Sequence, residues 1–493
     1  MSRKIVLNIS PYETRAAILE NDQPIEFFFE NKDTEKIVGC IFKGRVSNVV
    51  PGTQAAFVDI GIHKDAYLAL AGVEANESED EDDLKEIYKR PIQDVLRVGQ
   101  EVILQILKEP TPTKGPRSTM ALSFPGRYLV LMPTVDHVGI SRRISTDSER
   151  DRLKSIGKKI CPKGMGVIFR TTAEGLDESV LQADFRWLLK VWHKMEARAR
   201  GMPVRSMIHR DIPLPLKLVR DFFTDNIDRF IIDSPDEYKN ILEFCDFLSP
   251  LQRAALELYE GEMPIFEAFK LEKEIDNALQ TKLWLESGGY IFIQRTEALV
   301  AIDVNSGRFS GGSDLEETVF KVNLEAAKII ARQIRLRNLA GMIIIDFIDM
   351  TDPKHRSQVL KTLREAFKGD RNRPNILDFS ELGLIQMTRK RTSNSLEEIL
   401  KTPCSFCGGQ GSTLSLSMIA NRIRHEVISD AQRYQTEKIT IKASQEIVEF
   451  FKTQNEQRLK ELENRVKRQI ILVSNSEFQI DKYKIEPHTW KAN

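Results

Sequence analysis

The sequence predicts a multidomain α+β protein, and three observations support this fold class. Its 493 residues suffice for several domains of about 100–200 residues each. Residues 41–70 contain short strands separated by Gly and Pro turns at regular spacing, which is typical of a small closed barrel. Residues 297–350 contain two apolar strands joined by an amphipathic helix, which predicts an α/β unit with parallel strands.

The first part of the chain is predicted to be mostly β-structure. Residues 1–35 contain three segments of strand type, and the barrel candidate follows at 36–120. Within the barrel candidate, segment 74–86 holds eight acidic residues and one Lys, and we interpret it as a solvated loop. The formal net charge of the chain is zero, so the remainder carries a positive excess that is compatible with a polyanionic ligand.

Aromatic and basic residues are interleaved in the barrel candidate. Phe57 and Tyr67 lie in predicted strands, and Lys114 follows the last predicted strand of the barrel. Single-stranded nucleic acid needs this combination, because bases stack on rings while cations follow the phosphates. The alternative is that Phe57 is an ordinary core residue. Beyond the barrel, a long helix is expected from about 177 to 199, and helices are expected to dominate residues 215–280.

Two stretches each end an apolar strand on a carboxylate. "EALVAIDVNSG" carries Asp303 and Asn305, and "GMIIIDFIDM" carries Asp346 and Asp349. Asp and Asn often mark strand ends by bonding their own backbone, so a structural role is one interpretation. If the two strands are parallel neighbours, both carboxylates reach one edge of the sheet and can hold a hard divalent cation. We expect Asp349 to cap the following helix or to support the metal ligands.

Two of the five cysteines form a metal-type motif. An odd number of Cys without a secretory signal argues against a disulfide framework. In "CSFCGGQG", Cys404 and Cys407 have the spacing that lets two thiolates bind one tetrahedral zinc, although a plain turn is an alternative. Two further ligands are needed. His425 is one source, and a second copy of the chain fits better because the pair lies between two folded regions.

No membrane segment is expected. No apolar run approaches the ~18 residues that span a bilayer, and "MSRKIVLNIS" is no signal peptide. We therefore expect a cytoplasmic protein.

Five motifs in sequence order resemble the ribonuclease E/G family of bacterial endoribonucleases over nearly the whole chain. They are "GRVSNVVPGTQAAFVDIG", "GVIFRT", "TEALVAIDVNSG", "IIIDFIDM" and "CSFCGGQG". The chain ends soon after the last motif, so we expect a shorter member, without the long disordered scaffold that some members carry.

The resemblance implies a domain order. An RNase H-like domain is interrupted by an OB-fold RNA-binding barrel and a 5′-sensor region, and a DNase I-like α/β catalytic domain, a zinc link and a small C-terminal α/β domain follow. The expected bounds are 1–35 with 215–280 for the RNase H-like domain, 36–120 for the barrel, 121–214 for the sensor, 281–400 for the catalytic domain, 401–414 for the link and 415–493 for the last domain.

The resemblance also implies site residues. Asp303 and Asp346 become magnesium ligands, and Asn305 orients them or the substrate. Phe57, Tyr67 and Lys114 become RNA contacts. Cys404 and Cys407 become the zinc ligands that one chain contributes to a zinc shared between two chains, in a homodimer or a dimer of dimers.

A further implied site is a pocket for a 5′-monophosphate. Arginine offers a planar fork, which suits a phosphomonoester together with a hydroxyl and main-chain N–H groups. The matching positions are Gly126, Val130, Arg170, Thr171 and Arg373. Pro374 follows Arg373 and restricts the backbone there.

The expected activity is magnesium-dependent endonucleolytic cleavage of single-stranded, A/U-rich RNA in rRNA processing and mRNA decay. Products would carry a 5′-phosphate, and 5′-monophosphorylated substrates would be favoured. A metal route is preferred over His acid–base catalysis, because none of the seven His lies near the Asp strands in the sequence. One alternative is a non-catalytic RNA-binding or assembly protein. Another is a metal-dependent DNA nuclease or phosphatase.

Overall fold

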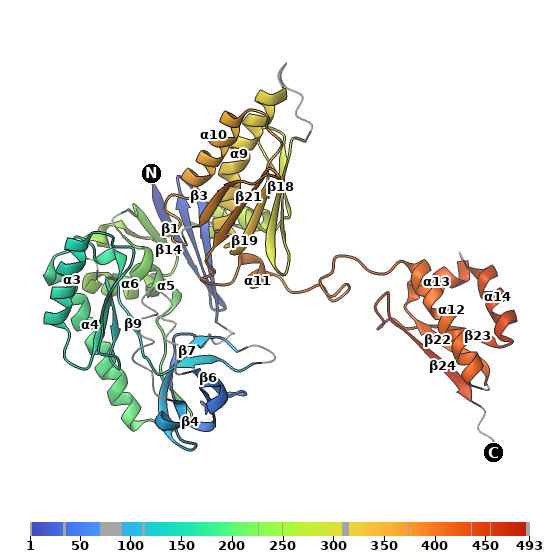
Figure 1. Cartoon of the computed structure of the whole chain (residues 1–493), viewed down its shortest axis with the longest axis horizontal. Helices are drawn as coiled ribbons and strands as arrows, with labels where there is room; N and C mark the ends of the chain where they lie inside the picture. The colour runs from blue at the N-terminus through green and yellow to red at the C-terminus, as the bar shows by residue number, and fades with distance from the viewer. Residues whose placement is uncertain are drawn as a thin grey trace. The chain divides into compact units, whose positions relative to one another are not determined.

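The computed structural model divides into two compact units, Met1–Ile399 and Leu400–Asn493. The structure describes residues 2–32, 36–69, 91–110, 114–224, 226–248, 250–307, 315–372, 374–434, 436–453 and 455–489. Figure 1 shows the elements along the chain. The acidic segment 74–86 lies outside the described residues.

One sheet joins the start of the chain to a segment more than two hundred residues later. Its strand order is β15-β14-β1-β2-β3. The first three strands form an antiparallel meander, and Lys4 of β1 pairs in parallel with Arg229 of β14. The strands are β1 Arg3–Ile9, β2 Glu13–Glu20, β3 Gln23–Asn31, β14 Arg229–Ile232 and β15 Leu256–Leu258.

Helices cover both faces of this sheet, which explains why Ile5, Val6 and Leu7 in the middle of β1 are all apolar and buried. Ile5 and Leu7 pack with α5 and α6, whereas Val6 packs with α7 and α8. The helices are α5 Leu214–Phe222, α6 Pro235–Leu248, α7 Ile265–Ala268 and α8 Leu271–Ala278. The expectation that helices dominate 215–280 missed β14 and β15, because strands of four and three residues give almost no periodic signal.

The predicted closed barrel is confirmed. Five strands run in the order β4-β5-β6-β8-β7, and β7 closes the barrel by pairing with β4. Its bounds are β4 Ile41–Val50, β5 Ala55–Asp59, β6 Ala66–Ala69, β7 Glu101–Lys108 and β8 Arg117–Thr119. The short helix α2 Ile92–Val95 contributes Ile92 to the barrel core, and β13 Ser206–His209 extends the sheet beside β4.

A smaller sheet follows the barrel in the order β11-β12-β10-β9, with two long helices packed on it. The strands are β9 Phe124–Pro125, β10 Leu129–Met132, β11 Val138–Ile140 and β12 Gly166–Phe169. The helices are α3 Asp147–Ile160 and α4 Glu178–Gly201. The long helix expected near 177–199 is α4.

The two Asp strands belong to a six-stranded sheet of order β16-β17-β18-β19-β21-β20. Helices α9 Leu315–Leu336 and α10 Pro353–Ala366 pack on one face of it (Figure 1). Alternation decides which side chains meet the helices, so Val300, Ile302 and Ile345 are buried while Asp303 and Asp346 are exposed. The strands are β16 Lys282–Trp284, β17 Tyr290–Arg295, β18 Leu299–Asn305, β19 Gly341–Asp346, β20 Asn375–Phe379 and β21 Leu384–Arg389.

The second unit is a three-stranded sheet of order β23-β22-β24 with three helices. Its bounds are α12 Leu416–Arg433, β22 Thr436–Ala443, α13 Gln445–Thr453, α14 Glu456–Val466, β23 Gln469–Ser474 and β24 Tyr483–Thr489. The helices and strands expected for a small α/β domain at 415–493 are present, but α13 and α14 follow one another, and so do β23 and β24, where the sequence predicts helices and strands in alternation. The bounds of the individual domains and the names RNase H-like, OB-fold and DNase I-like stay predictions. Over the described residues, no helix is both long enough and apolar enough to cross a membrane.

Candidate active site

Two aspartates lie side by side at the ends of adjacent strands. Asp303 of β18 and Asp346 of β19 are register partners in a parallel pair, on the face of the sheet away from the helices. Neighbouring strands lie ~4.8 Å apart, so the two carboxylates can share one cation. Asn305 Nδ2 donates to Asp303 Oδ2 at 2.7 Å and fixes that carboxylate. The predicted parallel pairing is confirmed, and the roles of these residues stay predictions.

The electrostatics of the pair favour a bound cation. Burial raises the pKa of the Asp346 carboxyl, and the charges of Asp303 and Asp349 raise it further. A divalent cation removes this repulsion, and magnesium typically takes one or two protein carboxylates while keeping several waters. The two exposed carboxylates therefore fit a magnesium ion.

The turn after Asp303 depends on a glycine. Gly307 has a φ of +63°, a conformation that residues with a side chain rarely adopt. A Cβ at this position would also collide with the carbonyl oxygen of Gly288. Gly307 thus lets the chain turn close to β17 immediately after the Asp-bearing strand.

Asp349 does not cap the helix after β19, so that expectation is wrong. Helix α10 begins at Pro353, and its N-cap is Asp352, which accepts a bond from the Lys354 N–H at 2.8 Å. Proline suits the first helical position and is preceded here by a good capping residue, so the helix starts later than expected. Asp349 instead lies near enough to Asp346 to raise its pKa.

Two side chains of α9 hold the segment after Asp346, and the sequence reasoning missed both. Asn323 is fully buried and exchanges two hydrogen bonds with the backbone of Ile348, at 2.8 and 3.1 Å. Glu316 accepts bonds from the Thr351 hydroxyl at 2.7 Å and from the Asp352 N–H at 3.2 Å. An Asn within the apolar stripe of a helix was the available signal, because a buried amide needs partners.

The barrel brings its two predicted aromatics together. Phe57 and Tyr67 are register partners on β5 and β6, and their ring centroids are 5.9 Å apart. Both are half-buried. The segment that begins at Lys114 runs beside them, because the Tyr67 N–H donates to the Pro116 carbonyl at 2.8 Å. A contact of these residues with RNA stays a prediction.

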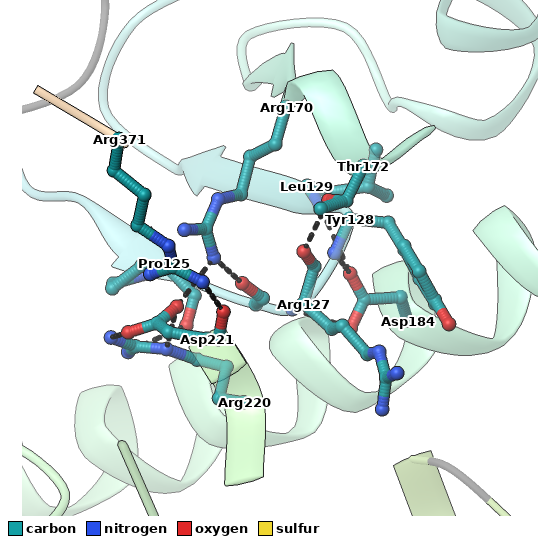
Figure 2. A network of polar contacts seen from close by, with 11 residues as sticks. Pro125, Arg127, Tyr128, Leu129, Arg170, Thr172, Asp184, Arg220, Asp221 and Arg371 are labelled. Carbon is teal, nitrogen blue, oxygen red and sulfur yellow. Dashed lines mark hydrogen bonds and ion pairs between the residues drawn. The ribbon is translucent and has the colours of Figure 1, made fainter. Parts of the chain in front are cut away.

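Arg170 lies in a cluster of charged side chains at the first turn after β12 (Figure 2). Its Nη1 donates to Asp221 Oδ1 at 2.8 Å and to the Gly126 carbonyl at 2.7 Å. Arg220 binds the same carboxylate at 2.6 Å. Burial alone would raise the pKa of Asp221, but Arg220 and Arg170 outweigh it and hold that pKa below its ordinary value.

Arg371 also reaches this cluster, and the sequence reasoning missed it. Its guanidinium donates to the Asp221 carbonyl oxygen and lies 3.7 Å from the centroid of the Phe222 ring. The arginine chosen from the sequence, Arg373, lies outside the described residues. Two guanidinium groups, of Arg170 and Arg220, therefore bind the Asp221 carboxylate, and a third, of Arg371, binds the backbone carbonyl of the same residue (Figure 2).

The turn at 126–129 is built on a buried carboxylate. Asp184 accepts bonds from the N–H groups of Tyr128 at 2.9 Å and Leu129 at 3.0 Å. Burial raises the pKa of Asp184, and these N–H groups oppose the rise. A Cβ at Gly126 would come within 2.7 Å of Asp184 Oδ2, which explains the glycine.

The other predicted sensor positions, Gly126, Val130 and Thr171, make backbone or hydroxyl contacts within the protein. The Gly126 N–H donates to the Leu129 carbonyl at 2.7 Å, so Gly126 acts on Arg170 through its own carbonyl. Val130 sits in β10 opposite Ile168. The Thr171 and Ser141 hydroxyls share a hydrogen bond of 3.1 Å.

Cys404 and Cys407 form a tight turn before α12. The backbone N–H groups of Cys407 and Phe406 lower the pKa of the Cys404 thiol, and the Gly411 N–H donates to Cys407 Sγ at 3.3 Å. Such N–H groups favour thiolates, as zinc binding requires. Within the described residues, no three His, Cys, Asp or Glu side chains group to hold a metal, so His425 does not complete this pair there.

A pH-dependent contribution to stability is predicted for Glu316. Bonds from the Thr351 hydroxyl, from the backbone of Thr351 and Asp352 and from His355 lower its pKa to about 2. Because this pKa is depressed on folding, the contribution is complete above the ordinary carboxyl pKa and is lost as the pH falls toward the folded value. We expect the thermal midpoint of Glu316→Gln to fall less between pH 5 and pH 3 than that of the unmodified protein.

Glu317→Gln is the matched control, because Glu317 lies on the same helical turn and forms an exposed ion pair with Lys321 at 3.4 Å. It should retain the pH dependence of the unmodified chain. Equal pH dependence in Glu316→Gln and the unmodified protein would contradict the assignment.

Comparison with known proteins identifies the family. A model described as Ribonuclease E/G family matches residues 123–392, and one described as RNase E/G, Thioredoxin-like domain, matches 403–488. Ribonuclease G of Escherichia coli K12 is 40% identical over 471 residues, covering 95% of this chain and 96% of the relative. Ribonuclease G of Haemophilus influenzae is 40% identical over 448 residues, covering 91% of each.

Ribonuclease E of Escherichia coli K12 is 38% identical over 436 residues, covering 85% of this chain but only 40% of the relative. The match thus covers nearly the whole length of these ribonuclease G relatives and less than half of this ribonuclease E. This chain belongs to the ribonuclease E/G family.

Proposed function

We infer that this chain is an endoribonuclease, as its curated relatives are named ribonucleases G and E. We further propose that it hydrolyses single-stranded RNA with magnesium at Asp303 and Asp346. The observation that carries this proposal is the register pairing of the two carboxylates on an exposed sheet face, with Asn305 bonded to one of them.

The chain's own residues hold and orient the reacting groups. Asp303 and Asp346 would bind the magnesium ion from two neighbouring strands, and Asn305 restricts the rotation of the Asp303 carboxylate. When bound, a magnesium ion lowers the pKa of a coordinated water and stabilises charge on the phosphate. Attack of a water on phosphorus would break the bond to the 3′-oxygen, so the products would carry a 3′-hydroxyl and a 5′-phosphate.

RNA recognition is proposed to begin in the barrel. Phe57 and Tyr67 offer paired rings for base stacking, and Lys114 lies on the adjoining segment. On the strength of the family resemblance, we propose A/U-rich single strands as substrates, with roles in rRNA processing and mRNA decay in the cytoplasm.

We propose that the arginine cluster binds the 5′-monophosphate of the substrate. Its support is the convergence of three guanidinium groups on Asp221, two on its carboxylate and one on its backbone carbonyl, because guanidinium groups suit a phosphate. Arg170 is prearranged by Asp221 and Gly126, which lowers the entropic cost of ordering it on a phosphate.

We propose that Cys404 and Cys407 supply two of four ligands to a zinc shared by two chains, in a homodimer or a dimer of dimers. The lowered pKa of Cys404 supports thiolate formation. The ligand count supports a partner, since tetrahedral structural zinc needs four ligands.

Asp303→Asn should reduce cleavage of a 5′-monophosphorylated single-stranded RNA by about 100-fold or more, because one of the two charges that hold the metal is lost. RNA binding in the absence of metal should be retained. Asp378→Asn is the control, since Asp378 lies in the same sheet but pairs with Arg364 at the surface.

Unchanged cleavage by Asp303→Asn would remove the proposed site and favour a non-catalytic role for these residues. Cleavage of DNA of the same sequence at a rate equal to RNA would favour the DNA nuclease alternative.

Arg170→Ala should abolish the preference for 5′-monophosphorylated over 5′-hydroxyl RNA while leaving cleavage of the 5′-hydroxyl substrate nearly unchanged. The physical reason is the loss of a charged donor from the phosphate pocket. Arg200→Ala, at an exposed position of α4, should keep the preference. If the unmodified enzyme cleaves both substrates equally fast, no working sensor exists.

Replacement of Cys404 and Cys407 by Ser should remove the bound zinc and shift the protein toward monomers in sedimentation. The unmodified protein should contain about half a zinc per chain, because two chains share each ion. Cys161→Ser should keep both zinc and assembly. One zinc per monomeric chain would rule out the shared site.

A further inference from the structure

A cluster of aromatic rings lies on the same sheet face as Asp303. We call Trp284 of β16 with Tyr290 and Phe292 of β17 the ring cluster. The Trp284 and Tyr290 ring centroids are 5.3 Å apart, and those of Tyr290 and Phe292 are 5.6 Å apart, both edge to face. Trp284 is 65% exposed. Tyr290 and Phe292 are half-buried, so Trp284 is the exposed member, and a large exposed ring packed on two others offers an apolar binding surface.

A single cation lies against all three rings. Lys282 Nζ is 4.1 Å from the Trp284 centroid, 3.8 Å from that of Tyr290 and 5.7 Å from that of Phe292. Cation–π attraction holds the ammonium at this place. The surface therefore combines apolar rings with a fixed positive charge, the two features that single-stranded nucleic acid requires.

The strand register places the ring cluster next to the carboxylate pair. Phe292 is the register partner of Asp303, and Lys282 is the partner of Phe292 on the next strand. Tyr290 is likewise the partner of Asn305. Partners on neighbouring strands share a face, and the strands lie ~4.8 Å apart, so Phe292 is one strand from Asp303 and Lys282 is two.

We propose that Trp284 and Tyr290 form a stacking platform for one base of the RNA strand beside the scissile phosphate, with Lys282 contacting a backbone phosphate. The location of the scissile phosphate rests on the proposed magnesium site. A second copy of the chain is a poorer occupant, because covering the platform would bury Lys282 and the neighbouring carboxylates at a desolvation cost.

The platform helps to determine which phosphodiester bond is cut, and it does not select a particular base. Every base has a π-face, so stacking tolerates any sequence. A base must nevertheless be present where the platform lies. This requirement is independent of the barrel, whose rings Phe57 and Tyr67 belong to another sheet.

The test measures binding of the full chain to a 5′-hydroxyl single-stranded RNA in a magnesium-free buffer without chelator, so that neither cleavage nor the phosphate pocket contributes and the proposed zinc link is kept. A set of RNAs carries one abasic nucleotide at each position in turn. In the unmodified protein, an abasic site opposite the platform should weaken binding by about 5- to 100-fold. Trp284→Ala should weaken binding of the intact RNA by a similar factor and abolish the sensitivity to that position.

Three further variants sharpen the result. Trp284→Phe retains a ring and should retain the abasic sensitivity, and Lys282→Gln should reduce the dependence of binding on salt concentration. Tyr12→Ala removes a ring that is 72% exposed in the turn between β1 and β2 and should change nothing. Mapping the cut made by the unmodified protein with magnesium should place the sensitive nucleotide within about two positions of the cleaved bond.

An unchanged abasic profile in Trp284→Ala would overturn the proposal, and so would a sensitive nucleotide far from the cut. Because binding is measured without magnesium, a failure of the platform proposal can be told apart from a failure of the proposed magnesium site. If Asp303→Asn still cleaves, the metal site is wrong whatever the platform binds. If Asp303→Asn is inactive and Trp284→Ala binds normally, only the platform is wrong.

Discussion

The parallel pairing of β18 with β19 is the contact on which the active-site geometry depends. Among the described strands of this sheet the other neighbouring pairs are antiparallel, so only this pair brings two carboxyl-terminal strand ends to the same edge. A slip of one residue would turn Asp303 toward the helices and into an apolar core, where an unpaired carboxylate is strongly disfavoured. The packing of α9 against the apolar face of these strands therefore fixes their register, and with it the position of the carboxylates, and it also stabilises the sheet.

The loop after α10 joins the Asp-bearing sheet to the arginine cluster. Asp370 and Arg389 form an ion pair of 2.8 Å whose side chains are 1% and 3% exposed. Arg389 also donates to the Leu339 carbonyl at 2.9 Å, so the buried charge is well satisfied. Arg371, the residue after Asp370, packs on Phe222. Asp370 thus anchors on strand β21 and Arg371 on helix α5, and the loop fixes the distance between the proposed sensor and the Asp-bearing sheet.

The features predictable from the sequence are those with strong local periodicity. Apolar residues recur regularly in the helix between the two Asp strands, in those two strands and in the barrel strands, so these elements can be recognised from the sequence. The pairing of Asp303 with Asp346 followed from them. The cap at Asp352 was missed because several acidic residues precede Pro353 and only the backbone decides among them. Arg371 and the ring cluster were missed for a different reason. Their neighbours are set by sheet register and by contacts between distant segments, which no single stretch of sequence contains.

The insertion of the barrel and the smaller sheet between β3 and β14 has a consequence for biosynthesis. The N-terminal meander lacks its parallel neighbour until the ribosome has made some two hundred further residues, since Lys4 pairs with Arg229. Until then one side of β1 presents unpaired backbone groups that can join other strands. The intervening barrel closes by pairings within its own segment, so it can fold while the first sheet waits. Nascent chains stalled before β14 are therefore the forms most exposed to aggregation.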